Sequence, residues 1–386
     1  MKKRIAFVTN TMTVGGVERA LVTLLDQIDY DQYEVAVWLK NAGVHENLIN
    51  SSVKVQYWNV GNSKAQLMGL LKKGKLFHFL YGMWCRVKLR QTGSDWVINE
   101  YYEAKAQPPC DEMPYDCVVA FQGLYSGVIA TALHRLDAPV KIAWIHGENS
   151  FTESQKSFIK RMYRKFTHIF CVSAATKKSF IATFPAVTDR TSVFYNLLDA
   201  DMIKKQAEEP PSEINMPLTL VTVGRISKPK GQVMIPKAAR LLLDAGYDIC
   251  WYLIGDGEMR QAVEDEIAKY GVEGRVVLLG TKSNPYPYMR NCDIYVQPSF
   301  SEGWGLTVQE AKILHKPIVV TPLDVMREQI VNGENGLIVD AVTPEAIVKG
   351  VRTLLDHPEM VEKFRTALWA EQHGNSNELQ KLYDLI

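Results

Sequence analysis

Two acidic residues, Glu302 and Glu310, stand eight positions apart in the stretch PSFSEGWGLTVQEAK, residues 298–312. The apolar run at 293–297 predicts a short buried strand, and the spacing from residue 306 onward predicts a helix. Glycines in the intervening loop leave backbone N–H groups accessible where the helix dipole favours anions. Carboxylates bind hydroxyl groups as paired acceptors. A phosphate site beside hydroxyl-binding carboxylates favours a sugar nucleotide as the ligand.

Two cations, Arg225 and Lys230, follow another predicted strand in the segment GRISKPKG. At the end of a strand they could neutralise a diphosphate leaving group without a metal ion. The alternative is that the two cations lie in a solvated loop and bind no ligand. Gly15 and Gly16 follow the first predicted strand, 4–9. They either admit a phosphate close to the backbone or form a simple tight turn.

His146 follows the apolar strand predicted at 141–145. A histidine there can reach a substrate hydroxyl, or it can be a structural residue with satisfied hydrogen bonds. Two Asp-x-Asp pairs, at 29–31 and 199–201, match a metal-binding pattern by letter only. The first pair lies at the wrong edge of the sheet and the second near a linker, so no metal site or other cofactor is expected.

The composition fits a two-domain protein of the reducing cytosol. The 386 residues are 47% hydrophobic, and the net charge of +1 gives no reason to expect nucleic acid as a partner. The six cysteines show no ligand-like spacing, which favours buried thiols over disulfides or zinc. The N-terminal apolar run is too short for a signal peptide, and no run approaches the ~20 residues that span a bilayer.

Strands alternate with helices along the whole chain, which predicts an α/β fold with parallel sheets covered on both faces. A charged, proline-bearing segment at 201–217 is interpreted as a linker. The predicted domains are therefore 1–200 and 218–369, with a C-terminal helix at 370–386 packing back on the first domain. Most of the candidate residues follow the carboxyl end of a strand, which is the edge where such sheets bind ligands.

Residues 64–90 form a basic segment with seven Lys or Arg residues, no acid and many large apolar side chains. Such a segment can lie on an anionic membrane surface. The alternative is a pair of amphipathic helices that only cover the first sheet.

Taken together, the Glu302–Glu310 spacing, the cations of GRISKPKG, the glycine pair and His146 resemble the retaining glycosyltransferases with a Glu-x7-Glu signature, known as family 4 or group 1. This resemblance implies the GT-B fold, in which two Rossmann-like, doubly wound domains face a central cleft. The likeness is strongest from 218 to 340.

The resemblance also implies a role for each matching residue. Glu310 would hold the ribose hydroxyls and Glu302 the hydroxyls of the donor sugar, with Trp304 standing where phenylalanine is more usual. The remaining implied contacts are the diphosphate for Arg225 and Lys230, the phosphates for Gly15 and Gly16, the sugar nucleotide for Gly224, the sugar and phosphate for the amides of Gly303, Trp304, Gly305 and Leu306, the donor sugar for His146, and the base for the backbone of Thr281 and Lys282.

The function expected from this resemblance is retaining transfer of a sugar from a nucleoside-diphosphate sugar, expected to be a UDP-sugar. The residues themselves leave uridine and guanosine open. The basic segment adds the expectation of a membrane-associated saccharide or lipid-linked acceptor in bacterial surface polysaccharide or capsule synthesis, on the inner face of the cell membrane. The alternatives are a sugar-nucleotide 2-epimerase of the same architecture and a non-catalytic sugar-nucleotide-binding protein.

Overall fold

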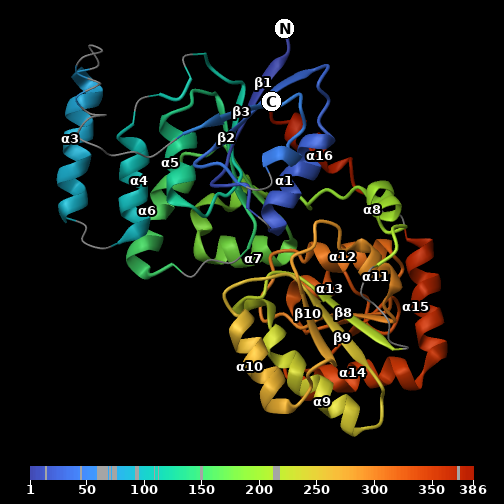
Figure 1. Ribbon diagram of the computed structural model, residues 1–386. Coiled ribbons are helices and arrows are strands. Elements are labelled where there is room, and N and C mark those ends of the chain that lie inside the picture. The colour runs from blue at the N-terminus through green and yellow to red at the C-terminus, as the bar shows by residue number, and fades with distance from the viewer. Residues whose placement is uncertain are drawn as a thin grey trace. The chain divides into compact units, whose positions relative to one another are not determined.

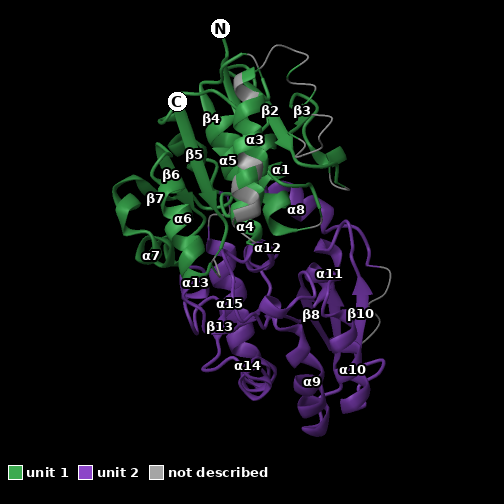
Figure 2. Ribbon diagram, turned by 90° about the vertical axis from the view of Figure 1, so that its left-hand side faces the viewer, with its two compact units in different colours: residues 1–197, 375–386 green, residues 198–374 purple. Residues whose placement is uncertain are grey.

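The computed structural model describes the whole chain apart from residues 14, 44–45, 59–67, 69–70, 72–75, 92–94, 108, 112, 148–150, 212–217 and 372–373. The chain forms two compact units, coloured separately in Figure 2. Unit 1 holds Met1–Leu197 and Asn375–Ile386, and unit 2 holds Leu198–Gly374. Each unit is an α/β domain with a single parallel sheet (Figure 1).

Unit 1 contains a seven-stranded parallel sheet in the order β3-β2-β1-β4-β5-β6-β7. The chain moves outward from β1 through β2 and β3, then returns to the centre at β4, so the switch point lies between β1 and β4. The strands are β1 (Lys3–Val8), β2 (Tyr33–Leu39), β3 (Lys54–Tyr57), β4 (Cys117–Ala120), β5 (Val140–Ile145), β6 (His168–Cys171) and β7 (Thr191–Val193).

Helices pack against the sheet of unit 1 because the central strands are apolar on both faces, and the outlying helix at 76–91 packs on a neighbouring helix instead. Strand β4, for example, is buried at all four positions. The helices are α1 (Gly16–Asp26), α3 (Leu76–Gln91), α4 (Trp96–Lys105), α5 (Ser126–His134), α6 (Glu153–Tyr163), α7 (Ala174–Thr183) and α16 (Glu378–Tyr383). The last of these reaches unit 1 from the far end of the chain, where the Tyr383 ring stacks on Tyr33 with the ring centroids 4.6 Å apart.

Unit 2 contains a six-stranded parallel sheet in the order β10-β9-β8-β11-β12-β13, with its switch point between β8 and β11. The strands are β8 (Thr219–Val223), β9 (Cys250–Ile254), β10 (Val276–Gly280), β11 (Ile294–Gln297), β12 (Ile318–Val320) and β13 (Leu337–Ile338). The helices are α8 (Ala200–Gln206), α9 (Ile235–Asp244), α10 (Arg260–Tyr270), α11 (Tyr286–Asn291), α12 (Leu306–Ile313), α13 (Asp324–Arg327), α14 (Pro344–Asp356) and α15 (Pro358–Ala370).

The two doubly wound parallel sheets are the architecture that the sequence predicts. The arrangement of the two units around a cleft stays a prediction. Helix α8 belongs to unit 2, although residues 201–217 were expected to form a linker, and residues 212–217 lie outside the described part of the chain. None of the described helices is both long and apolar enough to cross a bilayer.

Candidate functional site

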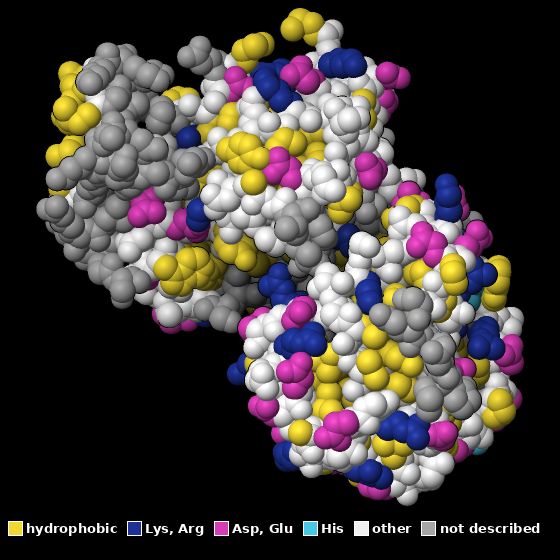
Figure 3. Space-filling view, in the orientation of Figure 1, with side chains coloured by type: hydrophobic (Ala, Val, Ile, Leu, Met, Phe, Trp, Pro, Cys, Tyr) yellow, Lys and Arg dark blue, Asp and Glu magenta, His cyan; other side chains and the backbone are white. Residues whose placement is uncertain are grey.

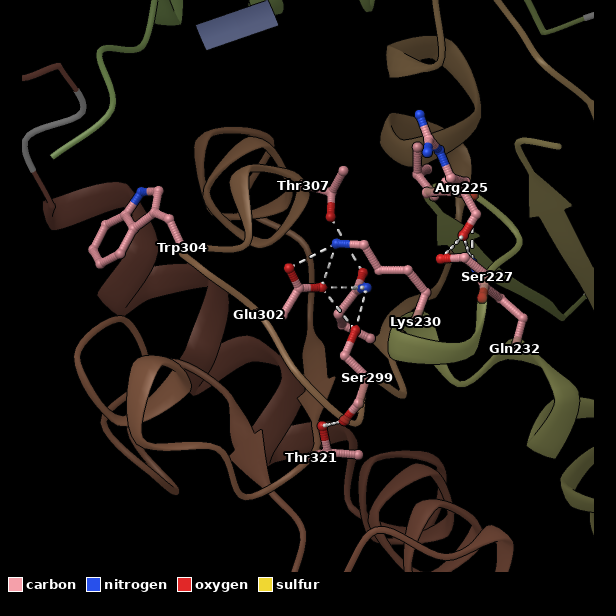
Figure 4. Close-up of polar contacts among 12 residues, drawn as sticks. Arg225, Ser227, Lys230, Gln232, Ser299, Glu302, Trp304, Thr307 and Thr321 are labelled. Carbon is pink, nitrogen blue, oxygen red and sulfur yellow. Dashed lines mark hydrogen bonds and ion pairs between the residues drawn. The ribbon is translucent and has the colours of Figure 1, made fainter. Parts of the chain in front are cut away.

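The central feature of unit 2 is an ion pair at the switch point of its sheet. Lys230, in the loop that follows β8, donates from Nζ to both oxygens of Glu302 at 2.7 Å (Figure 4). The Glu302 side chain is only 4% exposed and that of Lys230 28%. A nearly buried carboxylate is stable only with such compensation, so the pair holds the two loops together.

Gly231 allows these two loops to approach each other. Its backbone is left-handed, with φ +70°, and a Cβ added there would lie 2.0 Å from the carbonyl oxygen of Pro298. The loop of Lys230 therefore contacts the start of the Glu302 loop directly through backbone atoms. The amides of Phe300 and Ser301 add to this contact, since both donate to the carbonyl oxygen of Pro229.

Glu310 lies on α12, and its residue is almost completely buried. The hydroxyl of Tyr286, at the start of α11, donates to Glu310 Oε1 at 3.2 Å. The structure thus brings both glutamates of the predicted signature to the same loop and helix, with Glu302 before the helix and Glu310 in its second turn. Their roles toward a ligand stay predictions.

The loop before α12 ends in a glycine that is needed for its conformation. Gly305 has φ +81° and precedes the helix without a side-chain cap, and Leu306 begins it. The amides of a first helical turn have no partner within the helix, so this end of α12 favours an anion. Trp304 is mostly buried, and its carbonyl oxygen accepts from the side-chain amide of Gln329. The Gly303 to Leu306 backbone is thereby fixed in place.

The other predicted residues of unit 2 lie at the same edge of its sheet, in the loops that follow β8 and β10. Arg225 is exposed, and Figure 4 places its guanidinium away from the Lys230–Glu302 pair. Its carbonyl oxygen accepts from the side-chain amide of Gln232 at 2.9 Å. Gly224, just before it, has φ +154°. Thr281 and Lys282 follow β10, and the Lys282 ammonium lies 5.7 Å from the centre of the Tyr288 ring.

In unit 1 the predicted residues follow β1 and β5. Gly15 precedes α1 in an extended conformation, and Gly16 is the first residue of that helix. His146 follows β5 and is half-buried, with its ring centroid 4.6 Å from that of Phe121. How these residues lie relative to those of unit 2 stays a prediction.

The environment of His146 determines its protonation state. Burial lowers the pKa of His146 to about 3, although its hydrogen bond to the Phe121 backbone acts in the opposite direction. The Nε2 atom is buried and has no hydrogen-bond partner among the described residues. The Phe121 bond therefore belongs to Nδ1, and a neutral imidazole presents a lone pair at Nε2.

The described residues contain no group of three or more His, Cys, Asp or Glu side chains that could hold a metal ion. The two Asp-x-Asp pairs have structural roles instead. Asp29 accepts from the amide of Asp31, and Asp199 accepts from the amide of Met202 at the start of α8. Independence from metal ions stays a prediction.

The five described cysteines, among them Cys171 and Cys292, are free thiols, and burial raises the pKa of Cys292 to about 11.

Sequence reasoning missed several residues of the site. Gln297 and Ser299 are fully buried and bond to Glu302, and Gly231 sets the position of Lys230. The sequence contains a signal for two of them, because Gln297 is a polar residue at the end of an apolar run and Gly231 directly follows the cations of KPKG.

Known glycosyltransferases match this chain in sequence, and the matching family model lies within unit 2. The family model described as "Glycosyl transferases group 1" matches residues 204–368. An uncharacterized glycosyltransferase of Methanocaldococcus jannaschii is 31% identical over 277 residues, which is 69% of this chain and 73% of that protein. A Campylobacter jejuni N-acetylgalactosaminyltransferase, whose name specifies a diphospho-undecaprenol-linked acceptor, is 24% identical over 56% of this chain. Across three curated relatives, which include these two, the matched segments cover between 41% and 73% of the relative's length.

Solved structures match both units. The crystal structure of the Anabaena protein HepE in complex with UDP-glucose has a TM-score of 0.72 with 19% sequence identity, over 99% of this chain and 98% of that one. At this identity the likeness establishes the fold alone. The predicted GT-B fold class is therefore confirmed.

Proposed function

This chain belongs to the glycosyl transferases group 1 family, as the sequence predicts, and we propose that it transfers a sugar from a UDP-sugar to a saccharide or lipid-linked acceptor at a membrane surface, with retention of anomeric configuration. The observation that carries the proposal is the Lys230–Glu302 pair beside the N-terminus of α12. It combines a phosphate-binding cation with a hydroxyl-binding carboxylate at the switch point of a parallel sheet.

The leaving group places the first demand on this site. When the bond between the anomeric carbon and the diphosphate breaks, negative charge builds on the phosphate oxygens. The Lys230 ammonium and the first-turn amides of α12 can stabilise that charge. The departing phosphate can then take the proton of the acceptor hydroxyl, which attacks from the same face.

The site must also recognise hydroxyl groups, and the two glutamates are proposed to bind them. In our proposal Glu302 accepts from hydroxyls of the donor sugar and Glu310 from those of the ribose. Both carboxylates are buried, and a buried carboxylate discriminates strongly against a ligand that leaves it without a partner. Lys230 contacts both oxygens of Glu302, and in our proposal its ammonium moves to a phosphate when the sugar nucleotide binds.

His146 is proposed to accept a hydrogen bond from the donor sugar. With a pKa of about 3 it is neutral at physiological pH, so it offers the Nε2 lone pair and no positive charge. Arg225 is proposed to turn its exposed guanidinium toward the diphosphate, and Thr281 and Lys282 to contact the base through their backbone. Gly15 and Gly16 are proposed to admit the phosphates. The choice of uridine is supported by the UDP-glucose bound to HepE.

A membrane acceptor is supported by helix α3. Its exposed large side chains fall on one arc of the helix surface, at Leu76, Leu80, Met83, Trp84 and Val87. The helix rests on α4 through Tyr81, whose ring lies 5.2 Å from the Lys105 ammonium. Hydrophobic side chains line the outer edge of this region in Figure 3. In the rest of the predicted basic segment the structure describes Met68 and Leu71, both exposed, whereas the lysines at 72, 73 and 75 lie outside the described residues.

The membrane proposal is tested by vesicle sedimentation with phosphatidylglycerol at low salt. Leu80→Glu and Val87→Glu should each weaken binding about tenfold, because burying such a side chain contributes roughly 1.5–3 kcal/mol. Val331→Glu, at an equally exposed position in unit 2, is the matched control and should have no effect. Equal binding by all three variants would remove the membrane from the proposal.

The reaction is tested by incubating the protein with a panel of UDP- and GDP-sugars, with and without bacterial lipid extract. Acceptor-dependent release of UDP with formation of a glycosylated lipid or saccharide is the expected result. Formation of an epimer without any acceptor would identify a 2-epimerase instead. Stabilisation by the nucleotide without turnover would identify a binding protein.

A further inference from the structure

A buried glutamine lies behind the Lys230–Glu302 pair and contacts it. Gln297 is the last residue of β11 and is completely buried. Its Nε2 donates to Ser299 Oγ at 2.9 Å and to Glu302 Oε1 at 3.2 Å, and its Oε1 accepts from the Tyr295 hydroxyl at 2.7 Å and from the Thr307 hydroxyl at 3.2 Å. On the opposite face of β11, Ile294 and Val296 pack in the apolar core. Packing alone would be satisfied by an apolar side chain here.

These contacts fix the orientation of the amide. Glu302 has only acceptor oxygens, so the Gln297 oxygen cannot face it without repulsion. The two hydroxyls at Gln297 Oε1 reinforce the same orientation, because each can donate to an oxygen. The hydroxyls of Tyr295 and Thr307 therefore hold the amide nitrogen toward the carboxylate.

The contacts also distinguish the two oxygens of Glu302. Oε1 accepts from Gln297, from Ser299 Oγ at 2.7 Å and from Lys230. Oε2 accepts from Lys230, which is its only hydrogen-bond partner among the described residues. Figure 4 shows the bonds from Ser299 and Lys230 converging on this carboxylate. If Lys230 moves to a phosphate, Oε1 keeps two protein partners and Oε2 has none.

We propose that Gln297 is a positioning residue that keeps Glu302 Oε1 bound to the protein and leaves Oε2 for a hydroxyl of the donor sugar. This inference rests on the proposed function, because it assigns the sugar contact of that same site to a single oxygen. Gln297 acts through Glu302 and touches no reacting atom. The carboxylate is thereby held in one rotamer before and after Lys230 leaves, so the sugar meets a preorganised acceptor.

The experiment compares the binding of UDP with that of UDP-sugars by isothermal titration calorimetry. The probes are UDP and the UDP derivatives of glucose, galactose, N-acetylglucosamine and N-acetylgalactosamine, and the quantity compared is the affinity gain of the best UDP-sugar over UDP. Gln297→Leu should reduce this gain about tenfold while changing UDP affinity less than about twofold, because a hydrogen bond to a charged group is lost and the phosphate site is kept.

Two further variants separate positioning from folding. Tyr295→Phe removes one hydroxyl from the amide oxygen without touching Glu302, and it should reduce the gain by about threefold. Gln261→Leu is the matched control, because the side-chain amide of Gln261 on α10 donates to the carboxylate of Asp265 and not to Glu302. This control should keep the full gain. A merely structural role would lower the melting temperature of the Gln297 and Tyr295 variants and leave the ratio of the two affinities unchanged.

The outcomes distinguish the inference from the proposed function. The positioning role is supported if the affinity gain of the UDP-sugar over UDP is lost in Gln297→Leu and partly lost in Tyr295→Phe. If Gln297→Leu does not fold, the affinity gain of Tyr295→Phe decides the question. A full gain in both variants, with the gain lost in Glu302→Gln, overturns the inference and leaves the proposed function standing. If the unaltered protein binds no UDP-sugar better than UDP and turns none over, the proposed function fails and the inference with it.

Discussion

Replacing Gly231 with alanine tests whether the close approach of the two loops creates the site. The added Cβ would lie 2.0 Å from the Pro298 carbonyl oxygen, whereas real Cβ contacts are not shorter than 3.0 Å. The loop must therefore move by about 1 Å. A movement of that size is enough to break the 2.7 Å contact between Lys230 and Glu302.

Two costs add up in this variant. Alanine in a left-handed conformation costs roughly 1–2 kcal/mol. Weakening a nearly buried ion pair adds to that, up to the ~3–5 kcal/mol found when a buried partner is removed altogether. We expect Gly231→Ala to lower the free energy of unfolding by about 3 kcal/mol and the affinity for UDP about tenfold.

The assay is urea unfolding together with calorimetric titration of UDP. Gly274→Ala is the matched control, because Gly274 has nearly the same φ, +73°, and nothing within 4 Å of an added Cβ. The control should lose only the roughly 1–2 kcal/mol of backbone strain and bind UDP normally. If Gly231→Ala matched the control in both measurements, the loop contact would not position Lys230 and the reasoning would be wrong.

Three further predictions concern the glutamate of α12, the histidine of unit 1 and metal dependence. Glu310→Ala should weaken the binding of UDP by about tenfold or more, since a hydroxyl pair loses its acceptor, while the binding of free pyrophosphate should not change. His146 has a folded pKa of about 3 against about 6.5 unfolded, so it stabilises the protein fully above pH 6.5 and less as the pH falls toward 3. Unfolding at pH 5 should then show a loss of up to about 2 kcal/mol relative to pH 7.5 that is absent in His146→Gln. Titration of His146 should not shape the pH profile of turnover near pH 6.5. The profile in that range should therefore be the same in His146→Gln as in the unaltered protein. Incubation with EDTA should leave the rate of UDP release unchanged, because Lys230 and the helix amides stabilise the charge of the diphosphate. Loss of the rate in EDTA, with recovery only on addition of Mg²⁺, would contradict this.

The fold was predictable because its signal is local. Strands β4 and β9 are apolar runs of four and five residues, and buried parallel strands have this pattern. The positions of Glu302 and Lys230 follow from the same rule, since both come after central strands. Nothing more than the order of apolar and polar segments is needed for this part of the structure.

The contacts within the site were not predictable, because they depend on backbone approaches between distant segments. Lys230 and Glu302 are 72 residues apart, and their pairing requires a positive φ at Gly231 and the precise course of the Pro298 loop. The direction of the Arg225 side chain depends on which side of its loop faces solvent. The low pKa of His146 depends on burial against Phe121, which lies on another strand end. The spacing of apolar and polar residues along the sequence does not reveal any of these contacts.

A crystal structure with a bound UDP-sugar would show whether a sugar nucleotide separates Lys230 from Glu302. We expect Lys230 Nζ to lie within hydrogen-bond distance of a diphosphate oxygen, with Glu302 Oε1 still bound to Ser299 and Oε2 on a hydroxyl of the sugar. A diphosphate bound elsewhere, with Lys230 still on both oxygens of Glu302, would contradict this expectation.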